Sequence, residues 1–243
     1  MLTLLAWLYL VLLADSMDAM AGAGRSAIFM ALMPMGRWGP AEFALCFAMW
    51  LVMMIAMMVP SAAPMLFAFN ALSRSRPGRE RAGRWSVAFL LGYLLVWSAF
   101  SVLATGVQWG LREAALVTDL MASASPRLNA VLLLGAGLYQ FAPAKQVCLS
   151  RCRSPMGFLL AEWREGARGA LVMGLRHGGF CVGCCWGLMA LLFVGGVMNL
   201  LWIAVLAAVV LAEKLLPFGA MTARVAGVAL MAGGLWILAL SSG

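Results

Sequence analysis

A series of long apolar segments separated by short basic loops constrains this chain more than any other feature of its sequence. A helix crosses the hydrocarbon core of a bilayer with about 20 apolar residues, and most of these segments are close to that length. Transmembrane barrels would instead show weak alternating segments of about ten residues, which this sequence lacks. We therefore expect an all-α fold, a polytopic transmembrane helical bundle of six to seven spans. The seven segments are residues 2–20, 41–59, 85–107, 127–143, 170–194, 198–215 and 221–240.

The composition also indicates a chain surrounded by lipid. Hydrophobic residues make up 65% of the 243 residues and charged residues 11%, whereas a soluble domain has about 25% charged residues. No polar stretch is long enough for an additional globular domain, so we expect residues 1–243 to form a single integral membrane domain. The formal charge is +8, but its arginines lie in loops, which membrane topology explains better than nucleic-acid binding.

The basic loop residues predict the orientation of the bundle. Loops rich in Lys and Arg stay in the cytoplasm, and the seven-span arrangement places twelve such residues on one side and four on the other. The N-terminus is then cytoplasmic and the C-terminus lies on the opposite side. The twelve are Arg74, Arg76, Arg79, Arg81, Arg84, Lys145, Arg151, Arg153, Arg164, Arg168, Lys214 and Arg224; the four are Arg25, Arg37, Arg112 and Arg127.

The fifth expected span carries a group of metal-ligating residue types. His177, Cys181, Cys184 and Cys185 fall at helical positions i, i+4, i+7 and i+8, so they share one face. Ionisable residues within an apolar span are functional candidates. Eight residues of helix rise about 12 Å, so one ion cannot contact all four side chains. His177 with Cys181, or Cys181 with Cys185, can chelate an ion that takes its other ligands elsewhere. The alternative is that small cysteines simply pack in a glycine-rich helix.

A second pair of thiols, Cys148 and Cys152, lies at the cytoplasmic end of the fourth span. It follows Pro143, which we expect to break or kink the helix. Cationic neighbours lower the pKa of a thiol and favour the thiolate, which is both a metal ligand and a redox nucleophile. The pair is a candidate for completing the coordination offered by the fifth span, and the alternative is two structural thiols. The neighbouring cations are Lys145, Arg151 and Arg153.

The second span is rich in methionine, whose neutral thioether is a soft ligand for copper(I). We take Met53, Met57 and Met58 as candidate ligands, while packing of a flexible side chain is the alternative. Pro60 and Pro64 are expected to break the helix and free backbone carbonyls next to this stripe. The methionines of the stripe are Met49, Met53, Met54, Met57 and Met58.

Other polar and sulfur-containing residues receive simpler interpretations. Cys46 stands alone and is expected to pack in the core. Glu213 and Lys214 are expected to form an interfacial pair, with a counter-ion role as the alternative, and Asn199 is expected to cap a helix. Residues Ser154 to Glu165 are expected to contain a short interfacial helix. An outer ion-receiving site at Met17, Asp18 and Met20 is a further alternative.

Five blocks of sequence resemble a bacterial family described as predicted metal-binding integral membrane proteins, some members of which are labelled copper chaperones. The resemblance covers most of the chain from Trp50 onward, although the N-terminus is short for that family. It implies a multi-span, metal-binding protein. Together with the distribution of basic loop residues, we expect a protein of the bacterial inner (plasma) membrane with a periplasmic C-terminus. The blocks are Ala56 to Met65 (AMMVPSAAPM); Tyr139-Gln140 with Pro143, Lys145 and Cys148 to Pro155 (CLSRCRSP); Gly174 to His177 (GLRH) with Cys181 to Met189 (CVGCCWGLM); Gly196 to Asn199 (GVMN); and Glu213-Lys214 before Pro217.

The soft ligands favour a copper(I) chaperone, carrier or metallocentre-assembly factor that works by ligand exchange, with zinc and iron as alternative ions. Its expected partners are the lipid bilayer, the ion and a membrane or periplasmic metalloprotein. Two other functions stay open: a membrane thiol–disulfide or quinone-linked oxidoreductase, and an accessory subunit of a membrane oxidase or transporter. One histidine and no acidic pair leave no conventional hydrolytic site, so the leading interpretation is not an enzyme.

Overall fold

The structure is a computed structural model that describes residues 3–12, 39–76, 78–114, 125–197 and 199–241. Within these ranges it consists of helices and their connections, with no strand. The proposed outer site at Met17, Asp18 and Met20 lies outside the described residues. The elements are a helix at Thr3–Leu12, α3 (Pro40–Arg74), the 3-10 turn η1 (Arg79–Arg81), α4 (Ala82–Glu113), α5 (Pro126–Tyr139), α6 (Pro143–Arg153), α7 (Pro155–Glu162), α8 (Gly166–Ala190), α9 (Leu192–Gly195), α10 (Leu200–Leu215) and α11 (Gly219–Ser241).

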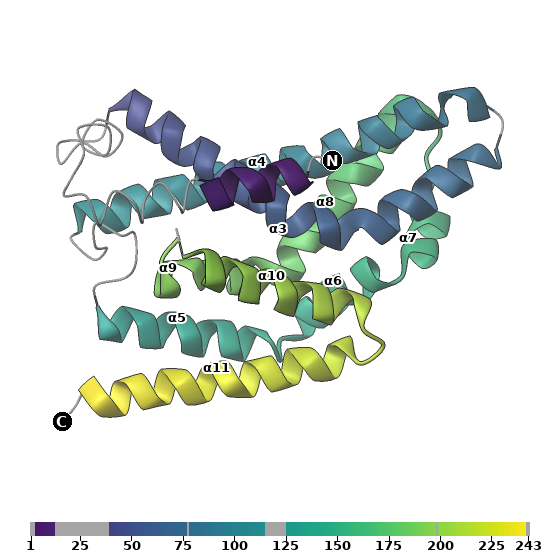
Figure 1. The fold of residues 1–243 in the computed structure, drawn as a ribbon. Helices are drawn as coiled ribbons and strands as arrows, with labels where there is room; N and C mark the ends of the chain where they lie inside the picture. Colours follow the sequence, from purple (N-terminus) through teal and green to yellow (C-terminus); the bar gives the residue numbers. More distant parts are fainter. Residues whose placement is uncertain (1–2, 13–38, 77, 115–124, 198, 242–243) are drawn as a thin grey trace.

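Helix α3 runs for 35 residues without interruption at Pro60 and Pro64, and it bends along its length (Figure 1). The prediction that these prolines break the helix is therefore wrong. The expected release of a carbonyl is nevertheless visible, because Pro60 lacks the N–H that would bond to the carbonyl of Ala56. The Trp7 indole N–H donates to that carbonyl at 3.1 Å. A side chain from the first helix thus replaces the missing backbone donor, and the methionine-rich helix stays continuous.

Among the described residues, four helical segments are long and apolar enough to cross a membrane: α3, α4, Gly166–Gly195 and α11. Helices α5 and α10 have 14 and 16 residues, which rise about 21 and 24 Å. Each is shorter than the hydrocarbon core of a bilayer, which is about 30 Å thick. The prediction of an all-helical protein with membrane-type helices is confirmed, while the count of seven spans is not.

Two helix pairs are in close backbone contact through glycine. Gly92 of α4 and Gly174 of α8 each lie directly against the backbone of the other helix. Gly137 of α5 and Gly227 of α11 meet in the same way, and these two helices lie side by side (Figure 1). Small residues allow membrane helices to approach closely. Helices α6 and α10 pack against α8, and α3 packs against α4 and α10.

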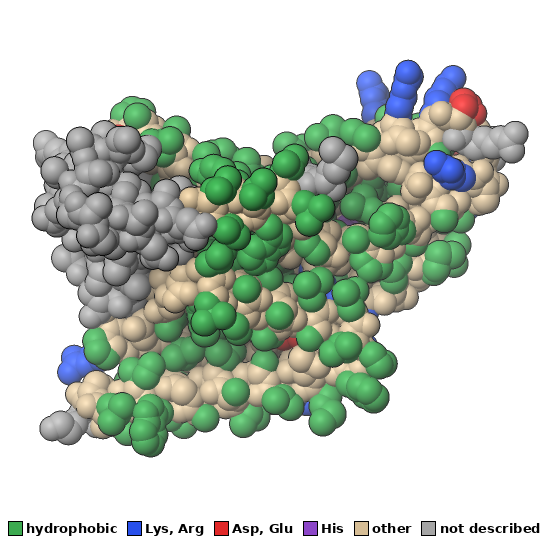
Figure 2. Space-filling view, viewed as in Figure 1, with side chains coloured by type: hydrophobic (Ala, Val, Ile, Leu, Met, Phe, Trp, Pro, Cys, Tyr) green, Lys and Arg blue, Asp and Glu red, His purple; other side chains and the backbone are tan. Residues whose placement is uncertain are grey.

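Apolar side chains are spread over the described part of the face shown in Figure 2. Exposed examples are Leu95 on α4, Leu201 on α10 and Trp236 on α11. Lys and Arg side chains gather at the end of the α3–α4 hairpin (Figure 2), where Arg81 and Arg84 are exposed. Apolar flanks with a basic end are what a helical bundle exposes to lipid and to the adjoining aqueous surface.

Candidate metal centre

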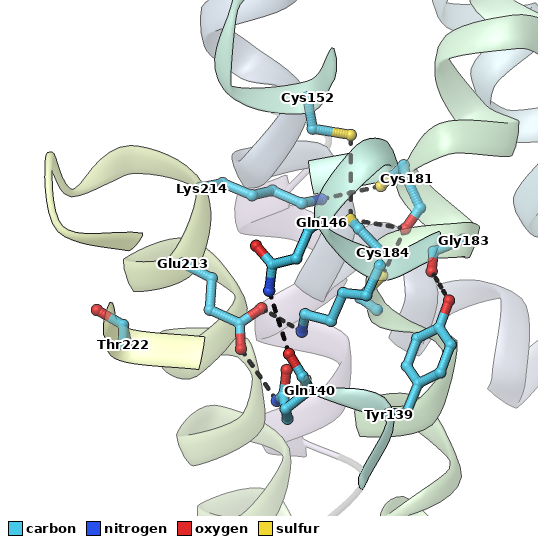
Figure 3. Close-up of polar contacts among 12 residues, drawn as sticks. Tyr139, Gln140, Gln146, Cys152, Cys181, Gly183, Cys184, Glu213, Lys214 and Thr222 are labelled. Atoms are coloured by element: carbon cyan, nitrogen blue, oxygen red, sulfur yellow. Dashed lines mark hydrogen bonds and ion pairs between the residues drawn. The ribbon is translucent and has the colours of Figure 1, made fainter. Parts of the chain in front are cut away.

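The short helix α6 brings a cysteine from one part of the chain to the cysteines of α8. Helix α5 ends at Tyr139 and α6 starts at Pro143, because a proline lacks the N–H of a helix interior but fits the first turn. The expected break at Pro143 is thus confirmed. Figure 3 shows Cys152 of α6 above Cys184 of α8, and their sulfur atoms are 4.0 Å apart.

A third helix contributes a thioether to the same region. The sulfur of Cys185 on α8 lies 3.9 Å from the sulfur of Met58 on α3. The thiols of Cys184 and Cys185 both donate to the Cys181 carbonyl, at 3.1 and 2.8 Å, which fixes their direction on the helix. We call these five residues the sulfur cluster: Cys152, Cys181, Cys184, Cys185 and Met58.

The spacing of the cluster suits pairwise binding of a soft ion. Two sulfur atoms that share an ion at a metal–sulfur distance of about 2.3 Å lie at most about 4.6 Å apart. The Cys152–Cys184 and Cys185–Met58 distances of 4.0 and 3.9 Å fall below this limit. Within the described residues, no three His, Cys, Asp or Glu side chains are placed to hold one ion together. The cluster therefore offers pairs of ligands and no preformed cage of these residue types.

The sulfur cluster is almost completely shielded from solvent. The side chains on α8 and α3 are at most 1% exposed, and Cys152 is 9% exposed. Cys148, one helical turn before Cys152, is the partly exposed thiol of α6, and its sulfur lies against Gly183 of α8. Burial raises the pKa of the Cys148 thiol, and the nearby Cys184 sulfur raises it further.

The prediction that neighbouring cations lower the pKa of Cys148 is therefore wrong. Lys145 is buried and paired with Glu213 at 2.7 Å. Arg153 donates to two backbone carbonyls in the turn between α10 and α11. Lys145 and Arg153 are close to Cys148 in sequence, but their charged groups bind Glu213 and backbone carbonyls instead of the Cys148 thiol.

Helix α10 directs a lysine into the cluster. The Lys214 ammonium lies 2.9 Å from the Cys181 sulfur and 3.0 Å from the Ser61 hydroxyl (Figure 3 shows the first contact). The Tyr93 hydroxyl is 3.1 Å from the same sulfur and donates to the Met58 carbonyl. The Cys181 sulfur is therefore contacted by polar groups from two other helices, α10 and α4, although it lies in an apolar core.

Glu213 and Lys214 do not pair with each other, contrary to the sequence-based prediction. Neighbouring residues of a helix do not face each other, and these two reach different partners. Glu213 accepts from Gln140 at 3.0 Å and pairs with Lys145 (Figure 3 shows Glu213 and Gln140). This buried ion pair ties α6 to α10, next to the cluster.

His177 occupies an aromatic enclosure one helical turn from Cys181. Its ring stacks on Tyr93 at 5.6 Å and lies near Phe89 and Phe158. The side chain is 2% exposed, and its Nδ1 atom has no hydrogen-bond partner. Among the described residues it joins no group of three ligands, so its predicted role as a ligand stays a prediction.

The three candidate methionines are all buried in the same core. Met58 contacts a cysteine, whereas no hydrogen bond from a described thiol reaches Met53 or Met57. Cys46 is buried and free, as expected for a packing residue, and Asn199 caps α10 by accepting from the Trp202 N–H.

Sequence reasoning missed two polar residues at this site, Tyr93 and Ser61, and assigned two others, Lys145 and Lys214, to the wrong partners. The signal that marks the two lysines is their presence in or next to apolar segments, since a buried charge needs a partner there. Tyr93 and Ser61 carry no comparable signal, because both residue types are common in helices and only the fold brings Tyr93 to Cys181 and Ser61 to Lys214.

No curated protein and no solved structure matches the chain. A family model does match: PpoB2, described as a copper chaperone, over residues 47–237. That range covers most of the chain and includes every candidate ligand except those of the alternative outer site at Met17, Asp18 and Met20. The resemblance to a family with members labelled copper chaperones is thereby confirmed. The chain belongs to the PpoB2 copper chaperone family.

Proposed function

We propose that this chaperone works within the membrane and holds its cargo, copper(I), between sulfur atoms of the sulfur cluster. The observation that carries the proposal is the convergence of sulfur atoms from three helices. Cys152 and Cys184 lie 4.0 Å apart, and Cys185 and Met58 lie 3.9 Å apart. Residues so distant in sequence meet here in an almost solvent-free core.

The donor set favours copper(I) over the alternative ions. Thiolates and thioethers are soft ligands that select copper(I), and a thioether contributes no charge that must be desolvated. Structural zinc takes four ligands in a tetrahedron. Among the described residues, no three Cys, His, Asp or Glu side chains are placed to bind one ion. The pairs of sulfur atoms therefore suit copper(I), which binds with fewer ligands than zinc.

A chaperone must also release its cargo, and the arrangement supports stepwise ligand exchange. Cys148 is partly exposed, Cys152 follows one turn later against Cys184, and Cys185 leads to Met58. Beyond Met58, further buried methionines follow along α3. We infer that copper(I) moves from α6 through α8 to α3, and then to a membrane or periplasmic metalloprotein.

The four long apolar helices and the basic α3–α4 end support a location in the bacterial inner membrane. We propose that this basic end is cytoplasmic and the C-terminus periplasmic, because basic loops are retained in the cytoplasm. A reporter fused after Arg79 should be active as a cytoplasmic fusion, and one fused after Gly243 as a periplasmic fusion. Reporters that mark both sites as lying on one side would contradict this topology.

The copper site is tested by metal analysis of protein purified without oxygen and loaded with copper(I). Cys184→Ser removes a soft ligand at nearly constant volume, so bound copper should fall markedly. Cys46→Ser is the matched control, because Cys46 is a buried thiol of the same core. It should retain the copper content of the unmodified protein.

The two variants give a clear decision. Loss of copper from Cys184→Ser alone supports the sulfur cluster as the site. Equal copper content in both variants would mean that the cysteine face of α8 serves only packing, and the proposal would then fail.

A second candidate function is thiol–disulfide chemistry, which the proximity of Cys152 and Cys184 favours. Disulfide formation would bring these sulfur atoms to about 2.05 Å, and such a pair is what an oxidoreductase needs. Cys148→Ser with Cys152→Ser should then abolish thiol exchange, while methionine variants behave normally in every copper assay. That combination of results would favour the oxidoreductase over the chaperone.

A further inference from the structure

Trp7 reaches the methionine-rich helix α3 from the first helix of the chain (Figure 1). Its indole N–H donates to the Ala56 carbonyl at 3.1 Å, the carbonyl that Pro60 leaves without its usual backbone donor. In the same helix, Thr3–Leu12, Leu10 is buried in the core and Trp7 packs against that core. The contact therefore joins one face of the first helix to one particular turn of α3.

The turn that Trp7 contacts carries Met58, the thioether of the sulfur cluster. Met58 lies two residues before Pro60, and its sulfur is 3.9 Å from the Cys185 sulfur. Its carbonyl accepts from the Tyr93 hydroxyl of α4 at 3.0 Å. This turn of α3 is therefore held by hydrogen bonds from two other helices, and the thioether projects from the turn so held.

The same section of α3 lacks two of its own backbone hydrogen bonds. Pro64 has no N–H for the Pro60 carbonyl, just as Pro60 has none for the Ala56 carbonyl. Membrane helices tolerate proline where neighbouring groups satisfy the freed carbonyls, and sharp bends in helices occur most often at proline. The backbone that carries Met58 thus depends on donors from outside α3.

We propose that Trp7 is a positioning residue: its indole N–H keeps this turn of α3 closed, and the closed turn keeps the Met58 thioether against Cys185. The inference rests on the proposed copper site. Without the indole N–H, the carbonyl of the buried Ala56 has no donor, which is costly in an apolar core, so the turn shifts. Met58 then moves away from Cys185, and copper(I) held by this pair is released sooner.

The test measures how fast copper(I) leaves the full-length protein, loaded in detergent without oxygen, when a coloured copper(I) chelator is added in excess. Trp7→Phe removes the N–H and keeps an aromatic ring. We expect release to become about 3- to 10-fold faster, the range that corresponds to one hydrogen bond. Hydrogen exchange of the α3 amides near Pro60 should also become faster in this variant.

Trp202→Phe is the matched control. The Trp202 indole N–H also donates to a carbonyl at a helix end, that of Leu191 at 2.8 Å. This bond joins α10 to the end of α8 and does not involve α3. The same loss of an indole donor should here leave the rate of copper release unchanged.

Two further backgrounds show how Trp7 acts. Pro60→Ala restores a backbone N–H for the Ala56 carbonyl, so Trp7→Phe should leave the release rate unchanged in the Pro60→Ala protein. Lost packing by Trp7 would instead accelerate release in both backgrounds. In the Met58→Leu protein, Trp7→Phe should also have no effect, because the thioether through which Trp7 acts is absent.

The outcomes distinguish this inference from the proposed function. Unchanged release in Trp7→Phe overturns the inference, even if hydrogen exchange of α3 becomes faster, because Trp7 then stabilises the helix without serving the site. Faster release that persists in the Pro60→Ala or the Met58→Leu protein overturns it as well, and faster release that both changes suppress supports it. The copper site is judged separately: if Cys184→Ser and Cys46→Ser bind equal amounts of copper, that site is wrong and the inference falls with it.

Discussion

The two helix pairs α4–α8 and α5–α11 both pack closely through glycine, but they differ in the side chains that lie beside each contact. In each pair, glycines let the two backbones touch. Beside the α4–α8 contact lie Tyr93, His177 and Cys181, all of them buried. Beside the α5–α11 contact, Gly137 and Gly227 are flanked by the side chains of Met231 and Phe141.

The difference arises from the helices that cover each pair. Helices α6 and α10 pack against α8, while α3 packs against α4 and α10. These three helices contribute Cys152, Lys214 and Met58 to the cysteine face of α8. Helix α11 instead exposes apolar side chains such as Val225 and Trp236. Close packing through small residues is general in membrane helices. A chemical site requires further helices that add polar and sulfur-containing groups to that contact.

The largest effect is expected from the ion pair between Lys145 of α6 and Glu213 of α10, which lies next to the sulfur cluster. Glu213→Leu leaves Lys145 buried without its carboxylate, which should lower the free energy of unfolding by about 3–5 kcal/mol. The double variant Lys145→Met with Glu213→Leu removes both charges and should recover most of the stability. Thermal unfolding in detergent measures both. A double variant as unstable as the single one would show that the pair is not the cause.

The next effect concerns the α4–α8 contact itself. Gly174→Leu places a side chain against the backbone of Phe89, which should cost about 1–3 kcal/mol or more and reduce copper retention. The control is Gly179→Leu on the same helix, where a Cβ meets no atom within 4 Å. Stability and copper content of the two variants can be compared directly. Equal behaviour would argue against a tight α4–α8 contact.

The α5–α11 contact should respond in stability alone. Gly137→Leu collides with the Gly227 carbonyl and Met231, so a loss of about 1–3 kcal/mol is expected. Copper bound per folded molecule should stay unchanged, because the sulfur cluster lies on other helices. A fall in copper content at equal folded amounts would mean that the two pairs are not functionally separate.

The smallest change in stability is expected in the methionine stripe. Replacing Met53, Met57 and Met58 by leucine conserves volume and should cost less than about 1.5 kcal/mol. Copper affinity should nevertheless fall, since leucine cannot bind the ion. Met58→Leu alone should account for most of the loss, because Met58 contacts Cys185. Normal copper handling in the triple variant would exclude the thioethers as ligands.

The sequence predicts the helices well because their signal is local. Apolar runs mark α3, α4, α8 and α11, and the break at Pro143 follows from the missing N–H of proline. The continuation of α3 through Pro60 depends on Trp7, a residue 49 positions from the carbonyl that it satisfies. No local rule contains that information.

The site is predictable in residue type but not in arrangement. Soft-ligand chemistry singles out the cysteines and methionines, yet Cys152 and Cys184 are 32 residues apart, and Met58 and Cys185 are 127 apart. The sequence predicts an ion pair between Lys214 and its neighbour Glu213. In the structure Glu213 pairs with Lys145 of α6, whereas Lys214 contacts Cys181 of α8.

If copper(I) occupies the proposed site, the burial of the sulfur cluster separates how tightly the ion is held from how fast it leaves. Sulfur chemistry would set the equilibrium, but an ion beneath Cys152, itself 9% exposed, could exchange only when the surrounding helices move. Collective helix motions take microseconds to milliseconds, far longer than side-chain rotations. A long residence time can thus arise without extreme affinity. The cargo is then protected from competing thiols in solution, and its release becomes a mechanical event that a docking partner can trigger.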